Sequence, residues 1–159
     1  MTGTARERLL DELSTVSRRY VASYALFDQA VADHLGLHPT DLQCLNLLML
    51  EDGPVTTGRV AELTGLTTGS ATRLVDRLER AGYVVRVRAE GDRRRVLVAM
   101  VPERVTEFER VWERLGGGWV ALFDDLDDTQ LALLIEHMRR TTEFSGEQAA
   151  RLRAGRTYG

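Results

Sequence analysis

The fold is decided by residues 56–83, TTGRVAELTGLTTGSATRLVDRLERAGY. Apolar side chains recur there at steps of three and four residues, which predicts helices over about Thr57–Leu63 and Thr68–Ala81. Gly65 permits a sharp turn between them, and Ala61 is small where the two helices must approach closely. Two short helices joined by such a turn are typical of a helix-turn-helix.

The second helix of this pair starts with small and hydrogen-bonding side chains, and Thr67 is placed to cap it. A helix that enters the major groove of DNA needs short polar groups at its N-terminal end, with Arg to bind guanine or phosphate. Each Thr or Ser alone is explained as well by ordinary capping of a surface helix. Their combination with the turn and a basic hairpin favours DNA contacts from Thr67, Thr68, Ser70, Thr72, Arg73 and Arg77, with Arg77 on the phosphate backbone.

After this helix the apolar period changes to that of a strand. Val85 and Val87 alternate with Arg, residues 90–94 (EGDRR) predict a turn, and a second alternating run follows over 95–100. A guanidinium at the tip of such a hairpin can enter a minor groove, although a DRRR run alone fits a solvated turn equally well. The candidate residues at the tip are Asp92, Arg93, Arg94 and Arg95, with Asp92 expected to pair with a neighbouring Arg and orient it.

Helices are also expected on both sides of this centre. The first runs from about Thr4 to His34 and is too long for a small core to cover alone, so part of its apolar face should pack on another subunit. Pro39 and Pro102 suit the first positions of two further helices. The glycines at 116–118 predict a kink, a break or close packing, and Asp127 with Gln130 predicts a capping box before the last helix. Residues 146–159 are polar and rich in Ala and Arg, and they are expected to form a tail or a frayed helix. The fold class is therefore mainly α with a small β-hairpin (α+β), a winged helix-turn-helix between scaffold helices.

Charge supports this organisation once it is divided along the chain. The 159 residues carry 21 basic and 24 acidic side chains, and every basic one is Arg. The net charge of −3 divides into −4 for residues 1–54, +4 for 55–104 and −3 for 105–159. A basic centre between acidic flanks is the distribution expected of a nucleic-acid-binding module on a scaffold.

Other classes of function find little support. One Cys excludes an internal disulfide framework, and no apolar run approaches the ~20 residues that span a bilayer. The charged N-terminus lacks an apolar signal core, so we expect a cytoplasmic protein with no membrane partner. Neither a catalytic constellation nor a phosphate-cradling loop is evident, which indicates that the protein is not an enzyme.

Two candidate sites remain weak. Cys44 lies on the apolar helix that begins at Pro39, so we expect a buried, inert thiol. A metal site could be assembled from the acids and histidines near the end of the first helix, but Gly36 and Pro39 interrupt the helix that would align them. We therefore expect neither a metal nor a cofactor. The residues considered for that metal site are Asp33, His34, His38 and Asp41.

The sequence resembles the MarR family of bacterial transcription regulators. TGLTTGSATRLVDRLERAGYV (64–84) is similar to the recognition-helix segment of that family, and DRRRVLVAMV (92–101) is similar to its wing, with Asp92 and Arg94 at the two signature positions. Two positions depart from the pattern, since Val101 and His38 stand where the family usually has Thr.

The resemblance implies a homodimer on roughly palindromic double-stranded DNA, with recognition helices in successive major grooves about 34 Å apart. It implies dimerisation helices over 1–36 and 103–145 and a DNA-binding lobe over 37–102. It also implies a repressor relieved by a small molecule, whose candidate pocket residues are Tyr20, Tyr24, Phe27, His38 and Trp112. The alternative is a winged-helix protein-interaction module that does not bind DNA.

Overall fold

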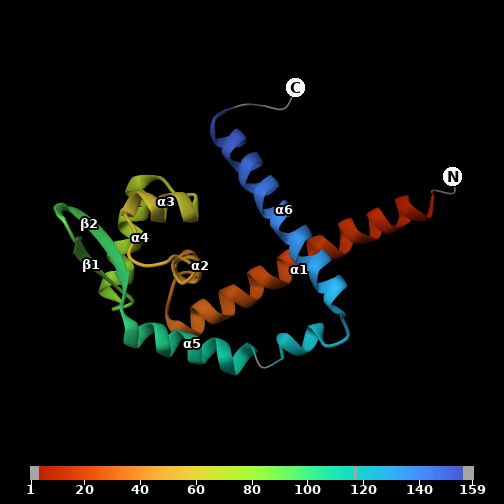
Figure 1. Ribbon diagram of the computed structural model, residues 1–159, viewed down its shortest axis with the longest axis horizontal. Helices are drawn as coiled ribbons and strands as arrows, with labels where there is room; N and C mark the ends of the chain where they lie inside the picture. Colours follow the sequence, from red (N-terminus) through yellow and green to blue (C-terminus); the bar gives the residue numbers. More distant parts are fainter. Residues whose placement is uncertain (1–3, 117, 156–159) are drawn as a thin grey trace. The chain divides into compact units, whose positions relative to one another are not determined.

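A computed structural model describes residues 4–116 and 118–155, apart from the side chains of Arg93 and Leu115. The described chain is mainly helical with one β-hairpin (Figure 1), which confirms the expected fold class. The elements in chain order are α1 (Ala5–Leu35), α2 (Pro39–Leu48), α3 (Thr57–Thr64), α4 (Thr68–Arg80), β1 (Val84–Ala89), β2 (Asp92–Met100), α5 (Pro102–Gly116), a 3-10 helix η1 (Val120–Phe123) and α6 (Asp128–Arg153).

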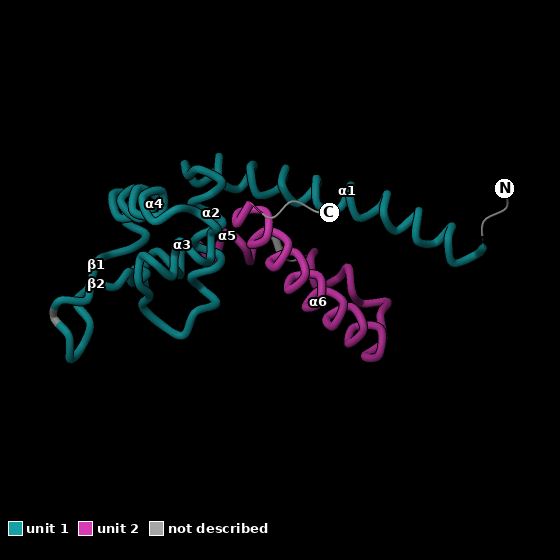
Figure 2. Tube along the Cα trace, turned by 90° about the horizontal axis from the view of Figure 1, so that it is seen from above, with its two compact units in different colours: residues 1–107 teal, residues 108–159 magenta. Residues whose placement is uncertain are grey.

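The chain forms two compact units, residues 1–107 and 108–159 (Figure 2), and each is described by itself. The boundary falls inside α5, after Glu107. No helix in the described ranges is both long and apolar enough to cross a membrane.

Side-chain caps fix where the helices begin. Thr4 before α1 and Asp127 before α6 both form capping boxes, the second with Gln130 as the sequence predicted. His38 caps α2, because its Nδ1 accepts a hydrogen bond from the backbone N–H of Thr40 at 3.3 Å. His38 therefore fills the capping role at the position where Thr is more usual.

The core of the first unit is built by α2, α3, α4 and the hairpin. Gly65, with φ +68°, ends α3 in the left-handed conformation and turns the chain into α4, as expected. The apolar face of α4 is completely buried, and α2 supplies the facing aliphatic side chains. Members of this core with no accessible surface are Leu42, Leu45, Val60, Ala71, Leu74, Val75, Leu78 and Val84.

The hairpin is an antiparallel pair whose regular register runs from Val84 opposite Met100 to Arg88 opposite Val96. Val55 pairs with Val98 through two backbone hydrogen bonds of 2.7 and 3.0 Å and extends the sheet by one residue. The connecting turn contains only Glu90 and Gly91, the latter with φ +84°. The expected turn over 90–94 was therefore too long, because a left-handed Gly lets the chain reverse within two residues.

Arg93, Arg94 and Arg95 form a bulge in β2. Ala89 pairs with Asp92 and the adjacent Arg88 pairs with Val96, so these three residues have no counterpart on β1. A bulge of this kind locally interrupts the ladder and twists the strand. The three arginines are thus carried by a distorted strand beside the tip, where the sequence analysis had placed two of them in the turn.

The second unit begins within α5, and its glycine run shows one of the outcomes expected from the sequence. α5 ends at Gly116, and η1 follows as a separate turn, so the glycine run breaks the helix; Gly117 itself lies outside the described residues. α6 continues to Arg153 and is capped at Ala154, so the polar tail expected from residue 146 is helical for its first eight residues. Strong helix formers around Gly146 (Glu147, Gln148, Ala149, Ala150) outweigh its unfavourable propensity.

The long helices leave apolar side chains uncovered. None of the described residues of α6 is buried, and α1 buries only Val31 and Ala32 near its end. Hydrophobic side chains exposed along the two helices include Leu9, Leu13, Val16, Val21, Leu26, Leu133, Ile135, Met138 and Phe144.

Candidate nucleic-acid interface

The N-terminal turns of α4 present a polar surface over a buried apolar one. Thr67 Oγ1 accepts a hydrogen bond from the backbone N–H of Ser70 at 3.3 Å, which confirms the expected cap. Thr68, Thr72 and Arg73 are exposed, while Ala71 and Leu74 on the opposite face are completely buried. The core therefore fixes which face of α4 is directed outward.

A short network orders this surface. Thr67 Oγ1 and Ser70 Oγ lie 3.1 Å apart, and Arg73 Nη2 donates to Ser70 Oγ at 3.1 Å. Thr72 Oγ1 donates to the backbone oxygen of Thr68 at 2.9 Å. The residues predicted from the sequence for this helix are thus brought together, and Arg77 continues their row one turn after Arg73.

Arg77 has an intramolecular partner that the sequence did not predict. Its Nε and Nη2 donate to the two carboxylate oxygens of Asp41 in α2, at 3.0 and 2.5 Å. The side chain of Asp41 is 4% exposed and that of Arg77 41%. These hydrogen bonds raise the pKa of Arg77 above its usual range. The sequence carried one signal for this pair, an acid in the first turn of an otherwise apolar helix, and that acid was considered only as a metal ligand.

Arg86 links the hairpin to α4. Its Nη2 lies 2.5 Å from Asp76 Oδ1, its Nη1 donates to Glu79 Oε2, and its backbone N–H donates to Glu79 Oε1 at 3.1 Å. Arg104, at the start of α5, similarly donates to the backbone oxygen of Ala81 at the end of α4, at 3.2 Å. Both contacts fix the end of α4, and neither was anticipated from the sequence. The sequence carried a signal only for Arg86, which lies in a strand pattern and follows two acids spaced by three on the preceding helix.

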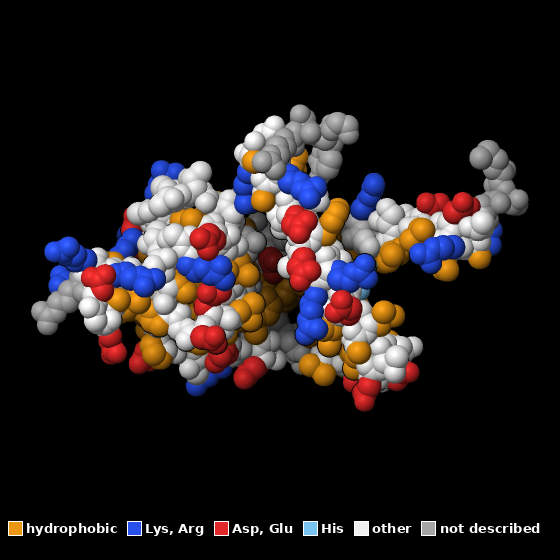
Figure 3. All heavy atoms as spheres, turned by 45° about the horizontal axis from the view of Figure 1, so that its top comes forward, with side chains coloured by type: hydrophobic (Ala, Val, Ile, Leu, Met, Phe, Trp, Pro, Cys, Tyr) orange, Lys and Arg blue, Asp and Glu red, His pale blue; other side chains and the backbone are white. Residues whose placement is uncertain are grey.

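The arginines near the hairpin tip differ from Arg77 and Arg86 because they have no acidic partner among the described side chains. Arg88, Arg94 and Arg95 are exposed and form no ion pair among the residues whose side chains are described, while the side chain of Arg93 lies outside them. Asp92 Oδ1 accepts a hydrogen bond from the backbone N–H of Arg94 at 3.0 Å. Asp92 therefore orders the backbone that carries Arg94, whereas the sequence had suggested a contact with a guanidinium. Figure 3 shows Arg side chains gathered at the end of the hairpin.

The ten arginines of residues 55–104 thus differ in their partners. Four of them neutralise acids of the same unit: Arg59, Arg77, Arg86 and Arg104. Arg73, Arg88, Arg94 and Arg95 form no ion pair among the described side chains, and Arg80 donates to the backbone oxygen of Asp76 at 3.1 Å. Most of the unpaired positive charge of this segment therefore lies on the hairpin and on α4.

Alternative chemistry in this unit finds no support. Cys44 is buried, and burial raises the pKa of its thiol to about 12, with a smaller contribution from the charge of Asp41. A buried, protonated thiol is a poor nucleophile at neutral pH. This agrees with the inert thiol expected from the sequence. The described residues contain no group of three or more side chains suited to hold a metal ion.

The residues suggested for an effector pocket are distributed over both units. Tyr20 and Tyr24 of α1 form a tilted ring pair with centroids 4.8 Å apart, and burial is the main cause that raises the pKa of Tyr24. Phe27 lies on the same helix, and His38 is occupied as the cap of α2. Trp112 belongs to the second unit, where it packs edge-on against Phe108 with centroids 6.0 Å apart.

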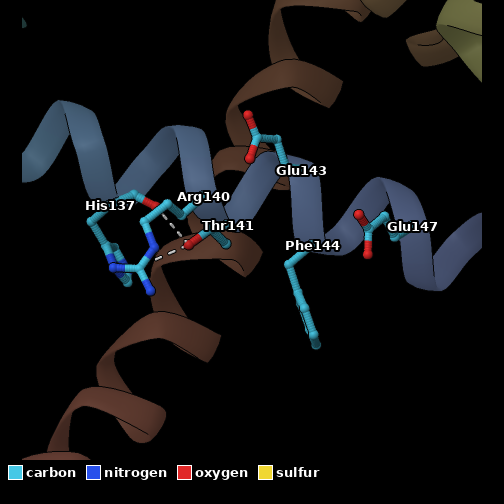
Figure 4. Close-up of a pocket in the computed structure, with 6 residues that line it drawn as sticks. All are labelled: His137, Arg140, Thr141, Glu143, Phe144 and Glu147. Carbon is cyan, nitrogen blue, oxygen red and sulfur yellow. Dashed lines mark hydrogen bonds between the residues drawn. The ribbon is translucent and has the colours of Figure 1, made fainter.

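A hollow on α6 involves none of these residues. Six side chains of this one helix line it, and Thr141 Oγ1 donates to the backbone oxygen of His137 at 2.9 Å (Figure 4). Phe144, the largest apolar member, is exposed. The lining residues are His137, Arg140, Thr141, Glu143, Phe144 and Glu147.

A two-helix motif with a buried inner face, an ordered polar outer face and a basic hairpin beside it defines a winged helix-turn-helix protein. The sequence profile of the MarR family matches residues 35–95, which include α2 to α4 and most of the hairpin. Over 152 residues the chain is 34% identical to the uncharacterized HTH-type transcriptional regulator YcgE of Bacillus subtilis (strain 168), covering 96% of this chain and 98% of that one. The chain therefore belongs to the MarR family of transcriptional regulators.

Solved structures share the fold at lower identity. A MarR family protein from Bacillus stearothermophilus superposes with a TM-score of 0.68 at 23% identity, covering 87% of this chain and 96% of that one. A MarR family transcriptional regulator from Silicibacter pomeroyi DSS gives a TM-score of 0.69 at 19% identity, covering 90% and 95%. These similarities extend over the long helices as well as the lobe.

Proposed function

We propose that the protein binds double-stranded DNA as a homodimer and represses transcription from a roughly palindromic operator until a small molecule releases it. The observation that carries DNA binding is the ordered polar row on the outer face of α4, held by a completely buried inner face. In this proposal Thr68, Ser70, Thr72 and Arg73 approach base edges in the major groove, and Thr67 caps the helix that carries them. The regulator needs neither a metal nor an organic cofactor.

The hairpin supplies a second contact in the proposal. Exposed guanidinium groups without an intramolecular acid can enter a minor groove, whose negative potential attracts Arg. Arg94 is the leading candidate because Asp92 orders the backbone at that position. Arg93 and Arg95 stand beside it in the same bulge and would bind the flanking phosphates.

Homodimerisation is supported by the uncovered apolar faces of α1 and α6. Leu13 of α1 is 52% exposed and Leu133 of α6 is 71% exposed, within helices of 31 and 26 residues. Contiguous apolar surface of this kind typically marks an interface. Two copies related by a two-fold axis would present two α4 helices to successive major grooves of a palindromic site.

The effector belongs to the same proposal. Its candidate residues remain Tyr20, Tyr24, Phe27 and Trp112, while His38 would act through the helix that it caps. A ligand can release DNA only if it binds the DNA-incompetent state more tightly than the competent one. A ligand screen would therefore follow release of labelled DNA, since simple binding does not report the switch.

The test begins with duplexes selected by the protein from a random pool, measured by fluorescence anisotropy at two salt concentrations. We expect a selected sequence with two-fold symmetry and an affinity that falls as salt rises. Arg94→Ala should weaken binding, whereas Arg139→Ala, which removes the same charge from α6, should not. Failure to enrich any duplex would contradict DNA binding and favour the protein-interaction module.

A further inference from the structure

The ion pair between Asp41 and Arg77 lies half inside the protein and half on its surface. The carboxylate uses both oxygens on Nε and Nη2 of the guanidinium, so the contact is side-on and fixes the plane of the group. Asp41 is almost completely buried, whereas two-fifths of the Arg77 side chain remains accessible. The buried carboxylate of Asp41 therefore holds the partly exposed guanidinium of Arg77 in place.

Stability alone does not account for this arrangement. Burial of a carboxylate is costly, and apolar side chains of similar size commonly stabilise a core at least as well as an ion pair. The surrounding positions of α2 are in fact apolar and completely buried, as with Leu42 and Leu45. What an acid adds at this position, and a Leu could not, is a fixed direction for the guanidinium.

The fixed group stands in the row that faces the proposed DNA. Arg77 follows Arg73 by four residues on α4, which places the two on one side of the helix, and Ser70 precedes Arg73 by three. Two nitrogens of Arg77 are engaged by Asp41, and Nη1 has no hydrogen-bond partner among the described residues. Nη1 therefore extends the ordered row by one turn with two N–H donors.

We propose that Asp41 is a positioning residue for DNA binding, which holds Arg77 so that Nη1 donates to a backbone phosphate. This inference rests on the proposed function. Asp41 is an acid that would lie close to DNA. The expected effect of its neutralisation on DNA affinity is therefore opposite to the one that charge alone predicts. If Asp41 acted only through its charge, its neutralisation would strengthen DNA binding. If it orients Arg77, neutralisation weakens binding, because an unrestrained guanidinium no longer places Nη1 at the phosphate and that contact is lost.

The experiment measures anisotropy of the selected duplex with the full-length protein over a range of salt concentrations. Asp41→Asn should reduce affinity by about fivefold, the middle of the range for one lost hydrogen bond. The salt slope should fall by about one released ion as the phosphate contact is lost. Glu51→Gln, which removes the acid that pairs with exposed Arg59 at 2.8 Å, is the matched control and should not weaken binding.

Two further variants separate orientation from folding. Thermal unfolding followed by circular dichroism shows whether Asp41→Asn is folded at the temperature of the assay. If it is not, Arg77→Lys keeps the positive charge for Asp41 but lacks the planar fork, and it should show the same loss of affinity and of salt slope. In a background of Arg77→Gln, Asp41→Asn should have no further effect on affinity.

The outcomes separate the positioning role of Asp41 from DNA binding itself. Equal or tighter binding by Asp41→Asn, or wild-type affinity and slope in Arg77→Lys, would overturn the positioning role while leaving DNA binding intact. A wild-type protein that binds no duplex would overturn the proposed function, and this inference with it. A loss of affinity with an unchanged salt slope would show that Asp41 only supports the fold.

Discussion

The helix-turn-helix lobe and the two long helices contrast in how they use hydrophobic side chains. In the lobe, apolar residues from α2, α3, α4 and the hairpin cover one another completely. In α1 and α6 the same residue types recur at helical spacing but remain largely exposed. Both regions have the amphipathic period of a folded helix, so the period alone does not tell whether the partner lies in the same chain. The difference indicates that the lobe buries its apolar faces within one chain, and it supports the proposal that the long helices pack on a second copy.

The largest expected effect tests whether the lobe holds itself together. Leu74→Ala removes a side chain with no accessible surface from the centre of α4 and should lower the free energy of unfolding by about 3 kcal/mol. Urea denaturation monitored by circular dichroism would measure this loss. Leu50→Ala, at an exposed position after α2, is the control and should change stability by less than about 0.5 kcal/mol. Equal effects would mean that the lobe is not packed as described.

The next effect concerns the long helices. Leu13→Glu places a charge on the uncovered face of α1 and should weaken self-association by about 2 kcal/mol, roughly thirtyfold, because the carboxylate would be desolvated at an interface. Sedimentation velocity over a range of concentrations would detect the shift to monomer. Leu50→Glu makes the same change on the lobe and should leave association unchanged. A Leu13→Glu protein that associates as tightly as the wild type would remove α1 from the interface.

A pH titration of stability tests whether Cys44 is fully buried in the core of the lobe. Because burial raises the pKa of Cys44 to about 12, its thiol stays neutral in the folded state while the unfolded thiol ionises above its ordinary value of 9.0. The unfolded state is therefore favoured as pH rises from 9 towards 12, by at most about 1.4 kcal/mol per pH unit. Cys44→Ala should lose this component. Parallel stability curves for the two proteins above pH 9 would show that Cys44 is not held as a neutral buried thiol.

The smallest expected effect comes from Gly→Ala, made once in the lobe and once in α6. A Cβ at Gly69 of α4 or at Gly146 of α6 would meet no described atom within 4 Å. Gly→Ala should therefore raise the free energy of unfolding by about 0.5 kcal/mol at either position, chiefly by restricting the unfolded chain. At Gly69, in the first turn of α4, the added methyl group should also weaken DNA binding, since it would stand between α4 and the groove. Anisotropy and urea denaturation together test this, and tighter or unchanged DNA binding by Gly69→Ala would show that no close approach occurs there.

Local signals in the sequence predicted most of the fold. Caps at Thr67 and Asp127, the left-handed Gly65 and the change of period at Val85 gave the elements within a residue or two. Local reasoning was less accurate where residues compete, as in the two-residue turn before Asp92 and the continuation of α6 through Gly146. There, several small preferences sum to a result that no single residue indicates.

The candidate site was predicted only in part for a different reason. Residues that face outward on α4 follow from helical spacing and a cap, so Thr68 and Arg73 could be named from the sequence. The acids that orient the cations could not, because Arg77 and Asp41 are 36 residues apart and meet only when α2 packs on α4. An Arg that binds an acid within its own chain and an Arg that is free for phosphate have the same sequence signature.

The bulge of β2 exposes the chain to proteolysis as well as to a ligand. Three successive arginyl bonds lie in a segment that has no counterpart on β1 and carries exposed side chains at Arg94 and Arg95. A protease that cuts after Arg needs an extended, unpaired stretch of backbone, and the bulge offers one next to an exposed turn. Brief trypsin digestion should therefore cut first at the wing and separate the fragments that carry α4 and α5. A DNA duplex seated on the wing would shield these bonds and lengthen the lifetime of the intact chain.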